Sequence, residues 1–215
     1  SEHPVVLNTT TVPADPPPAA TTDADGALRV VYLGSVTVER GARELAAIGR
    51  RLRAVAGDRV VLQVVGPAHG EAEEVLRTAR DEGALRWEGF VASDRALAML
   101  GGALAGLSPL HDTANFRPSV PTKIVEYMAW GIPVVSTPLP LATSLVERSG
   151  GGVLVPFGDV DRTVEQLLAW ADDPALAREV GRRGHDYALA RLDWSTQAPA
   201  FVAALQQVAD AGARS

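Results

Sequence analysis

Short apolar runs alternate along the chain with segments in which apolar residues recur at helical spacing. The apolar runs lie at residues 28–35, 59–66, 85–90, 103–110, 133–137 and 151–157. Helical spacing is found at residues 42–55, 71–82, 94–100, 122–130 and 159–171. Strands that are apolar at almost every position are typical of a parallel sheet covered by helices on both faces. The pattern therefore predicts an α/β fold with a doubly wound, six-stranded parallel sheet at residues 27–215.

The two ends of the chain do not follow this alternation. Residues 1–26 include the proline-rich stretch "TVPADPPPAATTDADG", which predicts an extended interdomain linker. Beyond Asp173 the pattern is purely helical, which predicts extra C-terminal helices with Trp194 as an anchor at their junction. The chain begins with Ser1 instead of Met, so we expect that a further part of the protein precedes it.

Composition narrows the classes of function. With 215 residues and 47% hydrophobic content, the chain can bury one substantial core. Its formal net charge of −6 argues against binding nucleic acid through bulk electrostatics. There are no cysteines, no signal peptide and no apolar run long enough for a transmembrane segment, so we expect a cytoplasmic protein.

Common nucleotide, metal and hydrolase motifs are absent from the expected places. The loop after the first apolar run reads "GSVTVERG", which is neither a dinucleotide fingerprint nor a P-loop. The four histidines lack metal-ligand spacing. The Asp-x-Asp pattern at residues 23–25 lies in the linker, and that at 159–161 fits a helix cap. Ser108, His111 and Asp112 are close in sequence but lack a nucleophile elbow.

The most informative segment runs from residue 115 to residue 140. Ser119 or Thr122 can cap a helix that ends at Gly131, and this helix begins where the fourth strand ends. Lys123, the only lysine of the chain, lies in its first turn, where a cation opposes the helix dipole. A charge kept there at a cost indicates an anionic ligand. Glu126 lies on the same helix face and can accept from two hydroxyls, although the same spacing also fits an ordinary surface ion pair.

The motif "PTKIVEYMAWGIPVVST", with "YLGSVTVERG" and "WEGFV" before it, resembles the C-terminal domain of family 4 retaining glycosyltransferases of the GT-B fold. The resemblance covers residues 5–208. It implies a domain that binds a UDP- or GDP-sugar, an acceptor-binding N-terminal domain that this chain lacks, and transfer without an essential metal or other cofactor. The fragment alone is then expected to be inactive.

The resemblance also implies the positions of the site residues. The donor diphosphate and sugar are expected at Gly34, Ser35, Arg40, Pro121, Thr122 and Lys123, and Arg117 is a further candidate that could supply the contacts of a glutamate missing at Pro118. The ribose and base are expected at Glu126, Gly89, Phe90 and Val91. Two positions depart from the family pattern: Ser35 stands where an arginine is usual, and Pro118 stands where a sugar-binding glutamate often lies. No catalytic residue is assigned.

Two other functions remain open on the sequence. A nucleotide-sugar epimerase would draw its acid and base from Glu126, His111 and Asp112, and a non-catalytic nucleotide-binding relative would explain the changes at Ser35 and Pro118. A peripheral membrane contact could involve the cluster of arginines on and just before the first helix, but a solvated helix face is favoured. These arginines are Arg40, Arg43, Arg50, Arg51 and Arg53.

Overall fold

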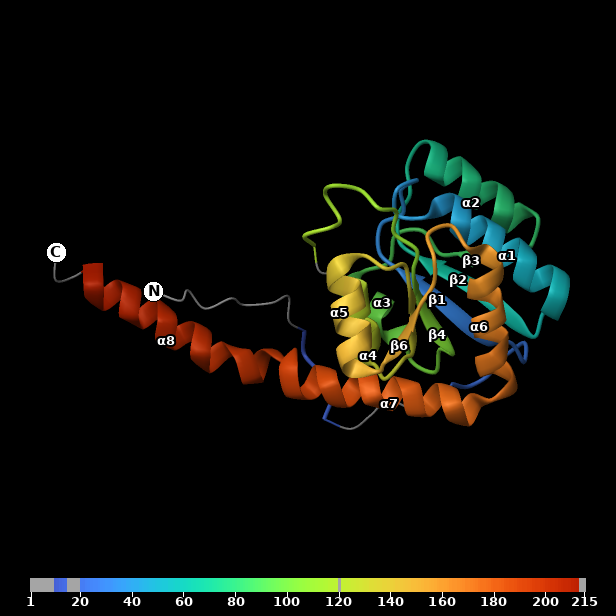
Figure 1. Cartoon of the computed structure of the whole chain (residues 1–215). Helices are drawn as coiled ribbons and strands as arrows, with labels where there is room; N and C mark the ends of the chain where they lie inside the picture. The colour runs from blue at the N-terminus through green and yellow to red at the C-terminus, as the bar shows by residue number, and fades with distance from the viewer. Residues whose placement is uncertain (1–9, 15–19, 120, 213–215) are drawn as a thin grey trace.

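The computed structural model describes residues 10–14, 20–119 and 121–212, and within them it confirms the predicted six-stranded parallel sheet (Figure 1). The strand order is β3-β2-β1-β4-β5-β6. The strands are β1 (Leu28–Leu33), β2 (Val60–Val65), β3 (Leu85–Trp87), β4 (Ala105–Ser108), β5 (Val134–Ser136) and β6 (Gly152–Leu154). β1 pairs in parallel with β2 on one side and with β4 on the other, so the direction of winding reverses between β1 and β4.

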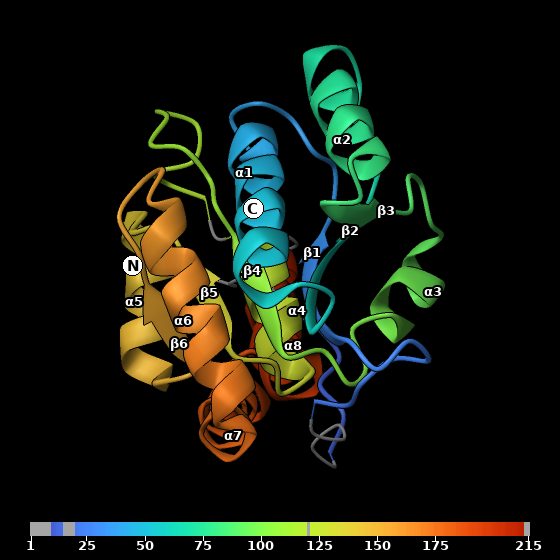
Figure 2. The same ribbon diagram turned by 90° about the vertical axis from the view of Figure 1, so that its right-hand side faces the viewer.

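Helices cover both faces of the sheet. They are α1 (Ala42–Ala56), α2 (Glu71–Asp81), α3 (Ser93–Ala98), α4 (Thr122–Ala129), α5 (Pro140–Ser149), α6 (Val160–Asp172), α7 (Pro174–Arg191) and α8 (Trp194–Gly212). Helices α1, α2 and α6 lie on one face, whereas α3, α4 and α5 lie on the other (Figures 1 and 2). Each face therefore has its own buried apolar cluster, as near-continuously apolar strands require.

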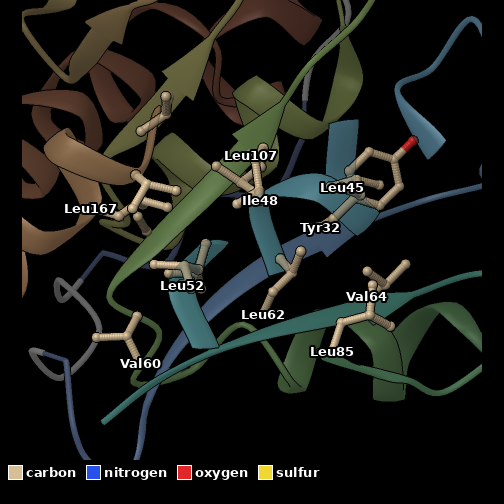
Figure 3. Packing of buried hydrophobic residues seen from close by; sticks show 14 of the residues in the cluster. Tyr32, Leu45, Ile48, Leu52, Val60, Leu62, Val64, Leu85, Leu107 and Leu167 are labelled. Atoms are coloured by element: carbon tan, nitrogen blue, oxygen red, sulfur yellow. The ribbon is translucent and has the colours of Figure 1, made fainter. Parts of the chain in front are cut away.

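The cluster beneath α1 shows why these residues form a core. Leu45, Ile48 and Leu52 recur at helical spacing on one side of α1 and are at most 2% exposed. They pack against Leu62 of β2 and Leu107 of β4, which are also buried (Figure 3). This packing covers the face of the sheet opposite α4.

Helix α5 is an element that the sequence pattern did not predict. Its first residue is Pro140, which reads as a breaker in a linear pattern but is favourable at the start of a helix because its missing N–H has no partner there. Ala142, Leu145 and Val146 are buried on its inner face. The glycine run at 150–152 ends α5 and enters β6.

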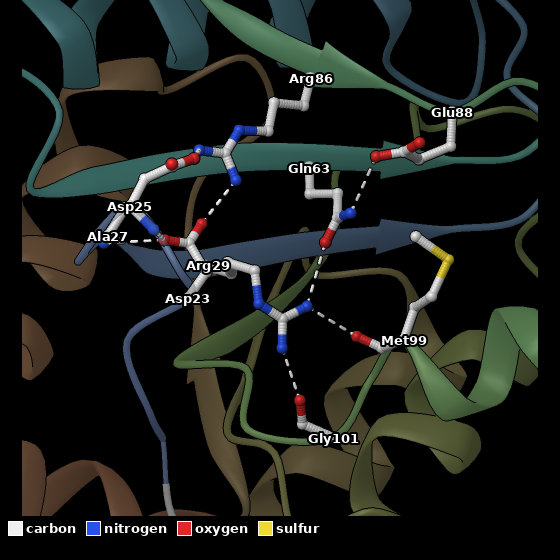
Figure 4. A network of polar contacts seen from close by, with 9 residues as sticks. All are labelled: Asp23, Asp25, Ala27, Arg29, Gln63, Arg86, Glu88, Met99 and Gly101. Carbon is white, nitrogen blue, oxygen red and sulfur yellow. Dashed lines mark hydrogen bonds and ion pairs between the residues drawn. The ribbon is translucent and has the colours of Figure 1, made fainter.

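The described parts of the N-terminal segment lie against the domain. Asp23 accepts hydrogen bonds from the N–H of Ala27 and from Arg86, and nearby Arg29 donates to Gln63 and to the Met99 carbonyl (Figure 4). These contacts hold the chain at the amino ends of the strands. The Asp-x-Asp pattern at 23–25 is therefore occupied by an arginine.

The last two helices join at a buried aspartate, and the prediction of Trp194 as the anchor is wrong. Asp193 is 5% exposed and accepts hydrogen bonds from the N–H groups of Val12 and Ser195, both at 2.8 Å. Trp194 is 45% exposed, and its ring lies near that of Phe201 on α8, which extends away from the sheet (Figure 1). None of the helices in the described ranges is both long and apolar enough to cross a membrane.

Candidate functional site

A cavity of about 620 Å³ opens at the carboxyl ends of the central strands. Its walls come from the segments after β1, β2, β3 and β4, together with the first turns of α3 and α4. This is the point where the strand order reverses, which is where ligands bind in doubly wound folds. The cavity is large enough for a small-molecule ligand.

Backbone contacts hold the first three of these segments together. The N–H of Gly34 donates to the Val65 carbonyl at 2.9 Å, and the N–H of Gly66 donates to the Gly89 carbonyl at 2.9 Å. Gly66 has a φ of 144°, and a side chain there would meet the Gly34 carbonyl oxygen at 2.1 Å. Only glycine permits this approach, so the cavity wall depends on Gly66.

Helix α4 is fixed to the sheet by Tyr127. The Tyr127 hydroxyl accepts from the Leu33 N–H at 2.9 Å and donates to the Leu107 carbonyl at 3.1 Å. It therefore bridges β1 and β4 beyond their last paired residues. Gly106 leaves room for the ring, because an added side chain would lie 2.4 Å from it. Sequence reasoning missed this tyrosine. The available signal was Gly106, a glycine inside an apolar strand, which often marks the close approach of another group.

The first turn of α4 faces the cavity without a side-chain cap. The helix starts at Thr122 and its cap position is Pro121, so the prediction that Ser119 or Thr122 caps it is wrong. The Ser119 hydroxyl instead donates to the Asn115 carbonyl at 2.8 Å. No described residue accepts from the N–H of Thr122 or of Lys123. These two groups and the helix dipole form a local positive end at the cavity.

Lys123 is almost fully buried at this positive end, with 9% of its surface exposed. Its Nζ lies 3.7 Å from the centre of the Tyr32 ring, and no described residue forms an ion pair with it. Burial and the neighbouring Arg40 lower the pKa of Lys123 to about 7, while Glu126 acts in the opposite direction. A buried cation without an acidic partner is costly unless a ligand supplies the anion.

Two further charged groups lie beside the lysine. Glu126 is half-buried, and burial raises the pKa of its carboxyl, partly offset by Lys123. The Arg40 guanidinium reaches the Ser35 carbonyl at 3.4 Å. The cavity thus places two cations at one end and a carboxylate one helical turn away. Such a site can hold a diphosphate and accept hydrogen bonds from vicinal hydroxyls.

The cavity brings together nine of the predicted site residues. They are Gly34, Ser35, Arg40, Phe90, Val91, Pro121, Thr122, Lys123 and Glu126. Arg117 does not line the cavity, because its guanidinium forms two hydrogen bonds to the Asp112 carboxylate at 2.6 and 2.8 Å. Gly89 contributes only the carbonyl that accepts from Gly66.

Sequence reasoning did not include about half of the wall. The additional lining residues are Leu33, Val65, Gly66, Pro67, Ser93, Ala96, Leu97, Leu110, Phe116 and Ser119. Gly66 and Pro67 follow the second strand, and the rule that ligands lie beyond the carboxyl ends of strands was sufficient to find them. The apolar members carry no signal of their own, since they look like core residues.

The carboxylates and histidines do not form a metal site within the described ranges, where no cluster of three potential ligands occurs. Asp159 caps α6 by accepting from the Arg162 N–H at 2.9 Å, as predicted. His111 lies 2.9 Å from a Glu44 carboxylate oxygen. These groups are therefore engaged in local structure.

The arginines of α1 form ion pairs with acidic side chains. Arg43 pairs with Glu71 of α2, and Arg50 pairs with Glu82 at 2.6 Å. Arg51 and Arg53 form ion pairs at 3.0 and 3.1 Å with the aspartates at positions 161 and 58. This pairing favours a solvated, internally neutralised helix face over a basic surface for membrane phosphates.

The chain thus forms a doubly wound α/β domain whose cavity, lined by Lys123 and Arg40, lies at the point where the strand order reverses. The chain belongs to the glycosyl transferases group 1 family, whose match covers residues 27–173. No curated protein matches the chain.

Solved structures with the same fold are GT-B glycosyltransferases. Sucrose-phosphate synthase from Thermosynechococcus elongatus superposes with a TM-score of 0.72 at 18% identity, covering 89% of this chain and 50% of that one. HepE of Anabaena, in complex with UDP and glucose, gives 0.64 at 18% identity over 87% of this chain and 48% of that one. The C-terminal domain of LpcC, a glycosyl transferase group 1 family protein of Francisella tularensis, gives 0.64 at 16% identity over 77% and 86%. The chain thus spans about half the length of the first two proteins and matches a separately solved C-terminal domain.

Proposed function

We propose that this chain is the donor-binding half of a retaining glycosyltransferase that moves a sugar from a UDP- or GDP-sugar to an acceptor, without an essential metal. The acceptor site then lies in an N-terminal domain outside this chain, and the chain alone does not catalyse transfer. The observation that carries the proposal is one cavity that combines three features: a buried lysine without an acidic partner among the described residues, helix N–H groups with no acceptor among those residues, and a half-buried carboxylate.

The cavity supports distinct roles for its charged groups. Lys123, Arg40 and the first turn of α4 stabilise the diphosphate, whose charge grows as the bond to the sugar breaks. Glu126 accepts hydrogen bonds from the two ribose hydroxyls. The base then occupies the end lined by Phe90 and Val91, where contact is apolar or through the backbone. In this mechanism the leaving phosphate takes the proton of the acceptor hydroxyl.

The geometry gives no support to an epimerase. Its acid and base would have to come from His111 or Asp112 as well as Glu126. His111 is held by Glu44, Asp112 is held by Arg117, and neither lines the cavity. The HepE structures with UDP and with UDP-glucose support a nucleotide-sugar donor for this fold.

A test of the ribose contact distinguishes this site from a general anion site. We expect the chain to bind UDP or GDP more tightly than the 2′-deoxy form of the same nucleotide by about tenfold, because a carboxylate that accepts two hydroxyl hydrogen bonds loses one of them. Glu126→Gln should weaken binding of the ribonucleotide by about tenfold and leave the deoxynucleotide within about threefold. Isothermal titration calorimetry measures all four affinities.

The matched control for this variant is Glu147→Gln, which changes an exposed carboxylate on α5 that does not line the cavity. It should leave both affinities unchanged. Absence of binding of both UDP and GDP at millimolar concentration would refute the proposed function. Equal loss of both nucleotides in Glu126→Gln would refute the ribose role only.

A further inference from the structure

Tyr32 lies directly beneath the cavity lysine, although it belongs to the core of the sheet. It is the fifth residue of β1, has no exposed surface, and packs among residues of the cluster under α1 (Figure 3). Its ring centre is 3.7 Å from the Lys123 Nζ. This distance is well within the range of a cation–π interaction, which is strongest when both groups are shielded from water.

An aromatic ring stabilises a cation differently from a carboxylate. The ring face attracts the ammonium group through its quadrupole but carries no net charge. A carboxylate in the same place would neutralise the lysine, and an incoming diphosphate would have to displace it. The ring therefore keeps Lys123 in a defined position while its charge remains available to a ligand.

The same side chain also contacts the part of the cavity wall that follows β1. The Tyr32 hydroxyl donates to the Ser35 carbonyl at 3.0 Å, and the Arg40 guanidinium reaches this same oxygen at 3.4 Å. Ser35 follows Gly34 in the segment after β1. One tyrosine thus contacts the lysine through its ring and the glycine-containing loop through its hydroxyl.

We propose that Tyr32 is a positioning residue of the donor site, whose ring holds the Lys123 ammonium toward the diphosphate and whose hydroxyl holds the Gly34–Ser35 segment against the same group. This role rests on the proposed function. It explains why a tyrosine, and not an aliphatic residue, occupies a fully buried position of β1.

The ring and hydroxyl contributions are separable by substitution. Tyr32→Phe keeps the ring and should weaken binding of UDP or GDP by no more than about threefold, since one neutral hydrogen bond to an adaptable loop is lost. Tyr32→Leu removes the ring face and should weaken binding by about tenfold or more. Circular dichroism shows whether the leucine variant folds.

A graded series avoids any loss of folding. Phenylalanines carrying one, two or three fluorines on the ring can replace Tyr32 with little change in shape, while each fluorine withdraws electron density from the ring face. The logarithm of the affinity should fall steadily along this series. A core residue with a purely structural role would give a flat series.

The pH profile provides a second readout. The charged groups facing the Lys123 ammonium are Arg40 and Glu126, and the Tyr32 hydroxyl is not ionised at these pH values because burial raises its pKa. Loss of the ring's attraction lowers the pKa of Lys123 below its value of about 7. The decline of affinity with rising pH should therefore begin at lower pH in the trifluorinated variant than in Tyr32→Phe.

The outcomes separate this proposal from the one on which it rests. If the unmodified chain binds neither UDP nor GDP, the proposed function and the role of Tyr32 both fail. If a nucleotide binds and Lys123→Met abolishes binding, but the fluorinated series is flat and its pH profiles coincide, only the role of Tyr32 is overturned. A steady decline with shifted profiles supports it.

Discussion

Two sets of basic side chains in this domain have opposite surroundings. Four arginines of α1 each form an ion pair with an acidic residue at the protein surface. Lys123 is the only lysine of the chain, is almost fully buried, and has an aromatic ring beneath it where an acid could stand. The surface cations are neutralised by acidic side chains, whereas no residue in the described part of the chain forms an ion pair with the cavity cation.

The difference shows which positive charges a ligand can use. An exposed ion pair contributes little free energy, because water already solvates both partners. A buried ammonium group without a counter-ion destabilises the fold, and its retention requires a function. The number of basic residues on α1 is therefore a poor guide to phosphate binding, and the local partners are a good one.

The largest expected effect comes from replacing the unpaired cation. Lys123→Met should weaken binding of UDP or GDP by about a hundredfold or more near pH 7, because the diphosphate loses its contact with a desolvated positive charge. The same change should raise the free energy of unfolding of the empty chain by about 1–2 kcal/mol, since it removes a buried charge that opposes the helix dipole. Calorimetry and urea denaturation measure the two effects.

The matched control is Arg50→Met, which places the same side chain where a paired surface cation was. Binding should be unchanged in this variant. If Lys123→Met lowers the stability of the empty chain, the lysine stabilises the fold and the contrast between the two sets of cations is broken.

A smaller effect is expected from pH, and its sign follows from the lowered pKa of Lys123. Above about pH 7 the folded, empty chain has lost the proton that a bound diphosphate would favour, so affinity should fall by up to tenfold per pH unit from about pH 7 to about pH 9. Lys123→Arg should show almost no decline, because a guanidinium does not titrate in this range. An identical decline in both proteins would place the titrating group elsewhere.

The lowered pKa of Lys123 predicts the opposite trend with pH for the free energy of unfolding. The unfolded lysine has a pKa of about 10.4, so between about pH 7 and pH 10 the unfolded chain binds more protons than the folded chain. The free energy of unfolding should therefore rise with pH relative to that of Lys123→Met, and the stability advantage of the variant should shrink. Urea denaturation at several pH values measures this.

Sequence reasoning found the fold because alternation of apolar runs and helical spacing is a local signal. It missed α5, whose Pro140 looks like a breaker, and it assigned a side-chain cap to α4 that the structure does not contain. Capping depends on where a hydroxyl points, and Ser119 turns back to its own loop. The order of residues along the chain does not show in which direction a hydroxyl points.

The residues of the candidate site also divide into those that sequence spacing predicted and those that it missed. Lys123 and Glu126 were visible because a charge at a helix N-terminus and a partner one turn away are features of sequence spacing. Tyr32 and Tyr127 were not, because their roles depend on contacts with residues far along the chain. Arg117 was expected among the donor contacts as a substitute for the glutamate missing at Pro118, but it pairs with Asp112 outside the cavity.

The smallest expected effect tests the other half of the comparison. Arg50→Gln removes a surface ion pair whose two side chains are each 46% exposed. We expect the free energy of unfolding to change by less than about 0.5 kcal/mol, because the lost attraction is offset by the freedom that both side chains regain. Affinity for UDP or GDP should be the same as in the unmodified chain. If urea denaturation shows that the free energy of unfolding falls by more than about 1 kcal/mol, the α1 arginines support the packing of α1 on α2. The surface ion pairs of this domain would then do more than neutralise charge.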